Sequence, residues 1–253
     1  MINLKIAIQK SGRLNEDSLT LLKECGISIN NGKDQLMAQA SNFRLDVLYL
    51  RNSDIPQYVR DGVADIAIIG DNTEKEKKTG IRHVLDLGFS RCRLSIAVPK
   101  NVDFQDISYL QGKKIATSYP NSLKDFLTEN DIEAEIHEIS GSVEIAPNIG
   151  LADAICDLVS SGSTLFKNGL KEVYKIFESQ AILVANSGLC GEKQELLAQL
   201  VFRIKAVLAA KYNKYILLNA PEKALDQICR LLPGMKSPTI MPLRENGWVS
   251  VHS

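Results

Sequence analysis

The sequence has no excess of charge of either sign, because 30 Lys and Arg residues balance 30 Asp and Glu residues in 253. Proteins that bind nucleic acid mainly through its phosphates normally carry a basic excess, so that class is disfavoured. No apolar run approaches the roughly 18–20 residues of a membrane span. Residues 1–10 also lack the apolar segment and cleavage site of a signal peptide. We therefore expect a cytoplasmic protein with neither nucleic acid nor a membrane as its partner.

Residues typical of metal centres and disulfide frameworks are also few. The five cysteines are scattered without a CxxC pair, and the three histidines lie far apart in the sequence. This pattern disfavours a disulfide scaffold and a zinc or histidine-cluster site. No GxGxxG follows a strand-like segment and no Walker A loop is present, which disfavours Rossmann dinucleotide binding and P-loop kinases. No protein metal ligands are predicted.

Short apolar segments alternate with helix-like ones. The expected strands are 4–8, 46–50, 65–69, 94–98, 114–118, 135–139, 181–185, 215–219 and 239–243. They are short, rich in Ile, Val and Leu, and bounded by Gly, Pro or Asn. The clearest helix is 192–212, where leucines and other apolar residues recur at i, i+3, i+4 and i+7. This alternation predicts an α/β protein with mostly parallel sheets.

Polar breaks near residues 99–101, 180 and 211–214 divide the chain. We expect one lobe from 1–98 plus 180–211 and a second lobe from 99–179. Residues 212–253 read as strand, helix and strand, with a further strand starting near Trp248, which predicts an incomplete third domain.

The segment from Glu144 to Leu165 is the richest in chemical groups. Apolar residues between 149 and 159 suggest a helix, which would put Asp153 and Asp157 on its opposite face. The small residues that follow offer hydroxyls and backbone N–H groups to an anion: Ser160, Ser161, Gly162, Ser163 and Thr164. Acids beside such a loop suit a ribose 5-phosphate. A helix that simply ends in a Ser/Gly turn is the alternative.

Other candidate groups follow expected strands, where ligands of α/β sheets gather. Residues 9–14 follow the first strand and include Lys10, Gly12, Arg13 and Leu14. Arg51 and Asp71 stand at the ends of two further strands, and Arg91-Cys92-Arg93 precedes another. A solvated loop or a capping role is the alternative for each, and Cys92 alone is more typical of a small buried residue.

Taken in order, these segments resemble ATP phosphoribosyltransferases. The resemblance rests on Glu144-x5-Gly150-x-Ala152-x2-Ile155-x-Asp157-Leu158-x2-Ser161-Gly162-x-Thr164-Leu165, and on 9–14, 54–56, 92–95, 115–120 and 141–144. Residues 214–221 and 232–234 resemble the start of the regulatory domain of the family's long form. The resemblance covers nearly the whole chain.

The resemblance implies a two-lobed core like type II periplasmic binding proteins, followed by a partial α+β, ACT-like regulatory segment. It implies a pentosyltransferase that opens histidine biosynthesis. ATP and 5-phosphoribosyl 1-pyrophosphate would give N1-(5-phosphoribosyl)-ATP and pyrophosphate, with Mg²⁺ as cofactor. AMP would inhibit, and the chain would form a homo-oligomer, either a dimer or a hexamer.

The resemblance also implies roles for individual residues. Glu144 and Asp157 would hold the ribose hydroxyls, with help from Asp153, and Ser160 to Thr164 would wrap the 5-phosphate. Lys10 and Arg51 would face the pyrophosphate. The residues around ATP would be Arg13, Leu14, Asp71, Cys92, Arg93 and Tyr119. Mg²⁺ would arrive on the pyrophosphate with few protein ligands.

Two other functions stay open at the sequence level. One is a cytoplasmic anion-binding or solute-binding module of the same fold, and the other is a purine-salvage phosphoribosyltransferase. Because the sequence stops at Ser253, early in the regulatory domain of the long form, we also expect little inhibition by histidine.

Overall fold

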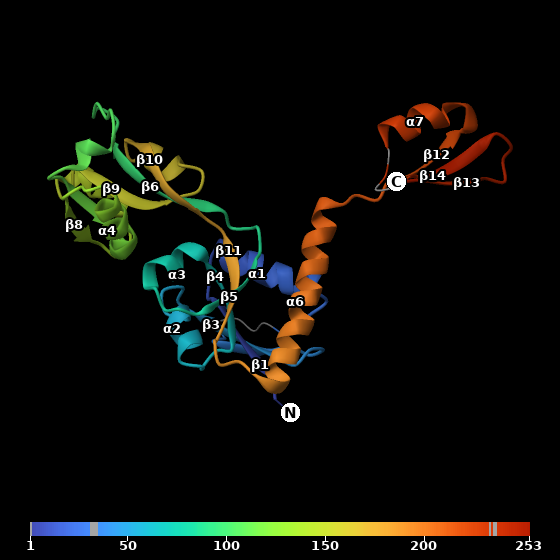
Figure 1. Cartoon of the computed structure of the whole chain (residues 1–253), viewed down its shortest axis with the longest axis horizontal. Coiled ribbons are helices and arrows are strands. Elements are labelled where there is room, and N and C mark those ends of the chain that lie inside the picture. Colours follow the sequence, from blue (N-terminus) through green and yellow to red (C-terminus); the bar gives the residue numbers. More distant parts are fainter. Residues whose placement is uncertain (1, 31–34, 233, 235–236) are drawn as a thin grey trace. The chain divides into compact units, whose positions relative to one another are not determined.

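The computed structural model describes residues 2–30, 35–232, 234 and 237–253. They form two compact units, residues 1–201 and 202–253. The helix α6 (Gly191–Tyr212) begins in one unit and ends in the other. Figure 1 labels the elements, and each unit is described by itself.

The first sheet of the larger unit has six strands in the order β2-β3-β1-β4-β11-β5. Strands β3, β1 and β4 are parallel, and the other pairs are antiparallel. The strands are β1 (Leu4–Gln9), β2 (Met37–Gln39), β3 (Leu45–Leu50), β4 (Ile66–Gly70), β5 (Arg82–Asp86) and β11 (Ala181–Ala185). The helices that follow β1, β3 and β4 are α1 (Arg13–Glu24), α2 (Ile55–Arg60) and α3 (Asp71–Lys77).

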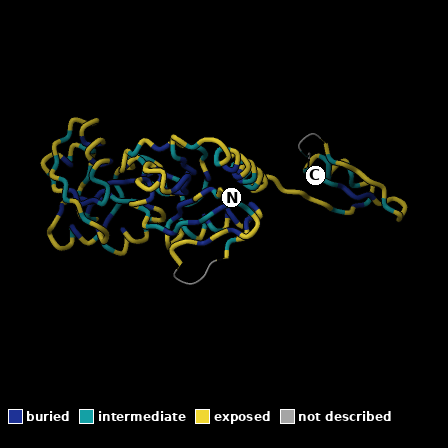
Figure 2. The backbone as a smooth tube through the Cα atoms, turned by 90° about the horizontal axis from the view of Figure 1, so that it is seen from below, coloured by how far each residue is buried: buried dark blue, intermediate teal, exposed yellow. Residues whose placement is uncertain are grey.

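The second sheet has five strands in the order β10-β6-β9-β7-β8. They are β6 (Cys92–Pro99), β7 (Lys114–Thr117), β8 (Glu135–Glu138), β9 (Ala154–Val159) and β10 (Leu170–Ser179). Around it lie α4 (Pro120–Glu129), α5 (Ser163–Lys167) and the 3-10 turns η1 (Ile107–Leu110), η2 (Val143–Ile145) and η3 (Pro147–Ile149). Buried side chains line both faces of this sheet, and Figure 2 shows the buried residues of the chain as dark-blue segments.

The chain crosses between the two sheets twice. It leaves the first sheet after β5 and returns through Gln180, the single residue between β10 and β11. The Ala181 N–H donates to the Phe89 carbonyl at 3.0 Å, and the Leu87 N–H donates to the Ala181 carbonyl at 3.0 Å. The two crossings therefore lie side by side. We call residues 2–91 with 180–201 the first lobe, and 92–179 the second lobe.

Three of the sequence expectations about this unit are wrong. Residues 94–98 belong to the second lobe, because β6 pairs with β9 and β10. Residues 154–159 form a strand and not a helix, because β9 is covered on both faces, and a continuous apolar run gives no decisive period. The sheets are mixed and not mostly parallel, since the strands next to the crossings run antiparallel to their neighbours.

The two lobes are joined by a buried carboxylate on α3. Glu76 is 6% exposed and accepts hydrogen bonds from the Asn121 N–H at 2.9 Å and the Ser122 N–H at 2.8 Å. The Ser122 hydroxyl donates to the same carboxylate at 2.8 Å. The residue before α4, Tyr119, provides no side-chain cap. A first-lobe residue thus caps a second-lobe helix.

The smaller unit contains a three-stranded antiparallel sheet in the order β12-β14-β13. Its elements are β12 (Leu217–Pro221), η4 (Glu222–Ala224), α7 (Leu225–Leu231), β13 (Thr239–Pro242) and β14 (Trp248–His252). The strand, helix and strand expected here are present, and the segment that starts at Trp248 forms the central strand. Apolar side chains such as Leu217 and Leu231 are exposed. Within the described parts of both units, no helix is long and apolar enough to cross a membrane.

We predict that Glu76→Ala lowers the free energy of unfolding by about 2–3 kcal/mol, because the first turn of α4 loses a buried, charged acceptor for two N–H groups and the Ser122 hydroxyl. Urea unfolding followed by circular dichroism measures the change. The matched control is Lys78→Ala, which removes an ion pair with Asp125 whose partners are about half exposed. An exposed pair of this kind contributes less than about 1 kcal/mol. Equal losses for the two variants would contradict the importance of the cap.

Candidate active site

The small-residue loop predicted to bind phosphate connects β9 to α5. Gly162 has φ +76°, a left-handed conformation that glycine adopts without strain. The Ser161 and Ser163 hydroxyls are hydrogen-bonded at 3.0 Å. Together with Glu144 and Asp157, residues 158–165 line a cavity of about 280 Å³. The structure therefore brings the two acids and the loop together.

Asp157 lies in the middle of β9 and is largely buried. Burial raises the pKa of Asp157 to about 6; the Leu158 N–H opposes this shift, and the nearby negative charge of Glu144 adds to it. The Leu158 N–H donates to the Asp157 carboxylate at 2.8 Å. A carboxylate with few internal donors in a cavity is available to accept hydrogen bonds from ligand hydroxyls.

Asp153 is not part of this cavity. Its carboxylate accepts from the Lys114 N–H at 2.9 Å, and its own N–H donates to the Lys114 carbonyl at 2.8 Å. In extended chain, four residues separate Asp153 from Asp157 by about 13 Å. The shared helix face expected for Asp153 and Asp157 is therefore wrong, and the structure keeps Asp153 outside the cavity that Asp157 lines.

Lys10 and Arg51 follow neighbouring parallel strands. Gln9 at the end of β1 pairs with Leu50 at the end of β3, and the Lys10 N–H donates to the Leu50 carbonyl at 2.8 Å. Both side chains are exposed. The structure therefore places these two cations at one edge of the first sheet, as expected for strands that end together.

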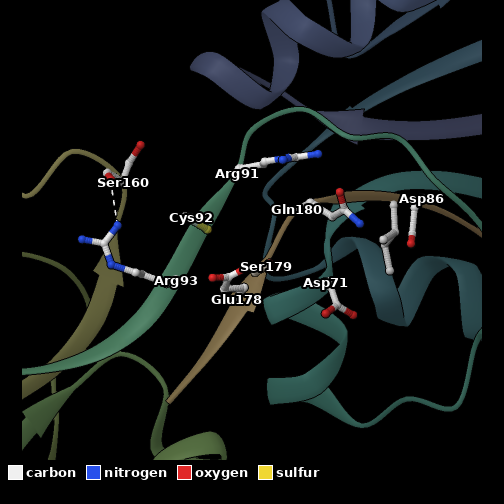
Figure 3. Close-up of a pocket in the computed structure, with 10 residues that line it drawn as sticks. Asp71, Asp86, Arg91, Cys92, Arg93, Ser160, Glu178, Ser179 and Gln180 are labelled. Carbon is white, nitrogen blue, oxygen red and sulfur yellow. Dashed lines mark hydrogen bonds between the residues drawn. The ribbon is translucent and has the colours of Figure 1, made fainter. Parts of the chain in front are cut away.

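A second cavity, of about 600 Å³, lies at the crossings between the two sheets (Figure 3). Its lining residues are Asp71, Asp86, Arg91, Cys92, Arg93, Ser160, Glu178, Ser179, Gln180 and Ile182. Asp71 begins α3, donates its N–H to the Gln180 carbonyl at 2.9 Å and pairs with Lys75 at 2.6 Å. Three of the residues expected around ATP, Asp71, Cys92 and Arg93, line this cavity.

Buried polar groups connect the lobes beside this cavity. The Ser179 hydroxyl accepts from the Asn72 N–H and donates to the Asn72 side-chain oxygen, each at 2.9 Å. Burial raises the pKa of Cys92, against a hydrogen bond with Ser179. Burial also raises the pKa of Tyr119, against a hydrogen bond with Asn72. Cys92 and Tyr119 are therefore neutral near pH 7, and neither is an activated nucleophile.

The sequence analysis assigned no functional role to Ser179. It appeared only in a polar stretch that marked a lobe boundary. Ser179 is the last residue of β10, a strand that was not among those expected, so the sequence carried no signal for it.

Arg13 and Leu14 begin α1 in the first lobe. The Arg13 guanidinium donates to the Ser160 hydroxyl at 3.2 Å and thereby reaches the phosphate loop. Leu14 is half-buried, and its carbonyl accepts from the Ser18 hydroxyl at 2.6 Å. Leu14 does not line the cavity at the crossings.

Arg93 is held by Glu172, a residue that the sequence analysis missed. The Arg93 Nε donates to Glu172 at 2.5 Å, Nη2 donates to the second carboxylate oxygen, and Nη1 donates to the Ser160 carbonyl at 3.1 Å. The Arg93 guanidinium holds the pKa of Glu172 below its usual range. Figure 3 shows the contact between Arg93 and Ser160.

The described residues contain no group of three or more His, Cys, Asp or Glu side chains that could hold a metal ion. Glu144 and Asp157 are the paired carboxylates of the phosphate-loop cavity. One or two carboxylates suffice for Mg²⁺ that arrives on a polyphosphate, because this ion keeps waters and phosphate oxygens as ligands. The two carboxylates therefore fit an Mg²⁺ ion that arrives on a polyphosphate, and not an ion held by protein ligands alone.

We predict that Asp157→Asn makes the ligand-free protein more stable at about pH 8, by about 1–3 kcal/mol. The native state binds this proton more tightly than the unfolded chain does, so the ionised carboxylate destabilises the fold above its pKa of about 6. The penalty disappears as the pH falls through about 6 towards 4. Asparagine keeps an oxygen for the Leu158 N–H. Urea unfolding at several pH values measures the difference, and a pH-independent gap would contradict the burial argument.

Comparison with known proteins identifies the family. The model of the ATP phosphoribosyltransferase family matches residues 51–206, and that of the HisG C-terminal domain matches residues 210–253. An ATP phosphoribosyltransferase of Cytophaga hutchinsonii is 58% identical, over 99% of this chain and 87% of its own length. One from Bacteroides thetaiotaomicron is 52% identical, over 99% and 88%.

Solved structures agree with this result. The ATP phosphoribosyltransferase (HisG:HisZ) complex of Thermotoga maritima contains a chain with a TM-score of 0.71 and 29% identity, covering 82% of this chain and 99% of that one. The substrate-binding protein of an amino-acid ABC transporter has a TM-score of 0.55 at 12% identity, covering 82% and 94%, and so shares the fold. The two-lobed architecture is that of periplasmic binding proteins, and the chain belongs to the ATP phosphoribosyltransferase family.

Proposed function

We propose that this ATP phosphoribosyltransferase carries out its reaction between the two lobes, with the activated sugar on the phosphate loop and ATP at the crossings. The family's reaction opens histidine biosynthesis and joins the phosphoribosyl group to N1 of the adenine. The observation that carries the proposal is that Ser160 lines both cavities. Ligands in the two cavities would therefore meet at the start of the loop.

In this proposal Glu144 and Asp157 accept hydrogen bonds from the ribose hydroxyls. Above its pKa of about 6, the Asp157 carboxylate is ionised and acceptor-only. Its negative charge also favours the positive charge that develops at ribose C1 as pyrophosphate leaves. The hydroxyls and N–H groups of residues 160–164 take the 5-phosphate. Because Asp153 is bonded to Lys114, we give it no contact with the sugar.

Lys10 and Arg51 are the cations proposed to face the leaving pyrophosphate. They are exposed, and neither has a hydrogen-bonded or ion-paired side-chain partner among the described residues. Free guanidinium and ammonium groups suit phosphate oxygens, bidentate for Arg and as a point charge for Lys. When bound, Mg²⁺ would neutralise part of the pyrophosphate charge. The protein would contribute at most Glu144 or Asp157 to it.

The cavity at the crossings is proposed to hold ATP. Adenine N1 is a neutral nucleophile with no proton to lose, so the reaction needs orientation and electrostatic stabilisation, not a strong base. Asp71, Cys92 and Arg93 line the cavity, and Tyr119 and Arg13 are connected to it through Asn72 and Ser160. Leu14, at the start of α1, would contact the nucleotide only from the first lobe.

Two further properties belong to the same proposal. AMP carries the adenine and ribose of ATP and would therefore inhibit by occupying the cavity at the crossings. A homo-oligomer, dimer or hexamer, is the assembly that the family resemblance implies for this chain.

A solute-binding function is the alternative, because the fold is shared with transporter substrate-binding proteins. Such a module would bind an anion without turnover. A purine-salvage enzyme would instead accept a free base.

We predict that the purified protein, given 5-phosphoribosyl 1-pyrophosphate and Mg²⁺, releases pyrophosphate with ATP and not with adenine. The absorbance of N1-phosphoribosyl-ATP and a coupled pyrophosphate assay follow the reaction. Pyrophosphate from adenine alone would establish the salvage alternative. Calorimetric binding of the sugar without turnover of either substrate would establish the solute-binding one.

We predict that Gly162→Val weakens binding of the phosphorylated sugar at least about tenfold, because the loop backbone must approach the phosphate. A Cβ at Gly162 meets only a Val159 methyl at 3.9 Å, so the protein itself leaves room for it. The strain of a positive φ costs about 1–2 kcal/mol. Isothermal titration calorimetry measures the affinity.

The matched control is Gly169→Val. Gly169 has φ +71° and lies outside the phosphate-loop cavity, and a Cβ added to it would meet no described atom within 4 Å. Both variants should lose similar stability, and only Gly162→Val should lose affinity. Equal affinities in the two variants would show that the 5-phosphate binds elsewhere.

A further inference from the structure

Glu172 lies on the edge strand of the second sheet, next to the strand that carries Arg93 and Ser95. It lies on β10, and its carboxylate accepts from the Ser95 hydroxyl at 2.8 Å as well as from Arg93. Ser95 is 1% exposed and pairs with Asp157 across β6 and β9. Glu172, Ser95 and Asp157 therefore lie on the same face of three neighbouring strands.

Two irregularities in β10 bring Glu172 within reach of Arg93. The register between β10 and β6 shifts between Glu172 and Tyr174, and again between Lys175 and Phe177. A regular register from the pair Glu178 and Arg93 would place Glu172 opposite Pro99. The two shifts place it opposite Ala97, closer to Arg93 by about 7 Å along the strand. Bulges of this kind re-aim side chains next to functional sites.

The Arg93 guanidinium contacts both the Glu172 carboxylate and the first residue of the phosphate loop. Nε and Nη2 are bonded to Glu172, and Nη1 is bonded to the Ser160 carbonyl. A guanidinium has five N–H donors in one plane, so fixing two of its nitrogens fixes the direction of the third. Ser160 is the first residue of the loop and the residue shared by the two cavities.

We propose that Glu172 is a positioning residue for the transfer reaction: it orients Arg93 so that the guanidinium holds the Ser160 carbonyl and fixes the start of the phosphate loop. This inference rests on the proposed function of the loop. Glu172 itself lines neither cavity. Its effect passes through Arg93 to the affinity for the phosphorylated sugar.

A purely structural ion pair would behave differently. The side chains of Arg93 and Glu172 are 32% and 26% exposed. Glutamine at position 172 keeps a side-chain oxygen for Ser95 and Arg93, so Glu172→Gln removes the charge without leaving these donors unpaired. Loss of the pair should therefore change the melting temperature little, while a loop that has lost its anchor binds its ligand more weakly. The separation of these two effects is the test of the proposal.

The experiment compares steady-state kinetics of the full chain and of Glu172→Gln. We expect the KM for 5-phosphoribosyl 1-pyrophosphate to rise at least about tenfold and kcat to change less than about threefold. Arg93→Lys keeps the charge and loses the planar fork, so it should show the same rise. If Glu172 acts through Arg93, the double variant should be no worse than either single one.

Glu135→Gln is the matched control. Glu135 lies on β8 of the same sheet, its side chain is 60% exposed, and it contacts His137 outside both cavities. A wild-type chain that makes no phosphoribosyl-ATP would refute the proposed function. An active wild type with a Glu172→Gln variant that behaves like Glu135→Gln would refute the positioning role. Additive effects in the double variant would also refute it. So would a rise in KM that is explained by a smaller fraction of folded protein.

Discussion

Every group that lines the cavity at the crossings depends on one constraint: the two passages of the chain between the sheets are bonded to each other. The bonds between Ala181 and both Phe89 and Leu87 fix the start of β11 against the segment between β5 and β6. The Gln180 carbonyl then accepts the first N–H of α3. Groups that are distant in sequence, such as Asp71, Cys92 and Ser179, thereby line one cavity. The chemistry assigned to this cavity needs fixed orientation more than it needs reactive side chains.

Charge is divided between the lobes in a way that suits the reaction. The cations Lys10 and Arg51 stand at the edge of the first sheet, whereas Glu144 and Asp157 belong to the second lobe. Burial disfavours the ionised form of Asp157, so the ligand-free protein carries an unfavourable charge there at neutral pH. Arg93, by contrast, is already neutralised by Glu172. The second lobe therefore has uncompensated negative charge near the place where, in the proposed reaction, positive charge would develop on the sugar.

The sequence was sufficient for the features that depend on local pattern. The position of the small-residue loop, the strand ends at Lys10 and Arg51, and most strands were predicted from spacing and strand boundaries. The errors have a common origin in tertiary structure. Strand β9 was taken for a helix because it is buried on both faces, and Asp153 was grouped with Asp157 for the same reason. Glu172 and Ser179 gave no signal, because their partners Arg93 and Asn72 lie 79 and 107 positions away. Such pairings are set by sheet register, which no local pattern contains.

The cap that Glu76 provides for α4 has a mechanical consequence. The lobes are attached at the paired crossings, through Ser179 and Asn72, and again where the buried carboxylate meets the first turn of that helix. The contacts of Arg13 with Ser160 and of Lys78 with Asp125 add weaker, exposed links. Pulling α4 away from α3 would leave the buried Glu76 carboxylate without its donors, which is costly for a charged group. A displacement of the second lobe that keeps this end of α4 in place therefore costs less free energy than one that separates the two helices.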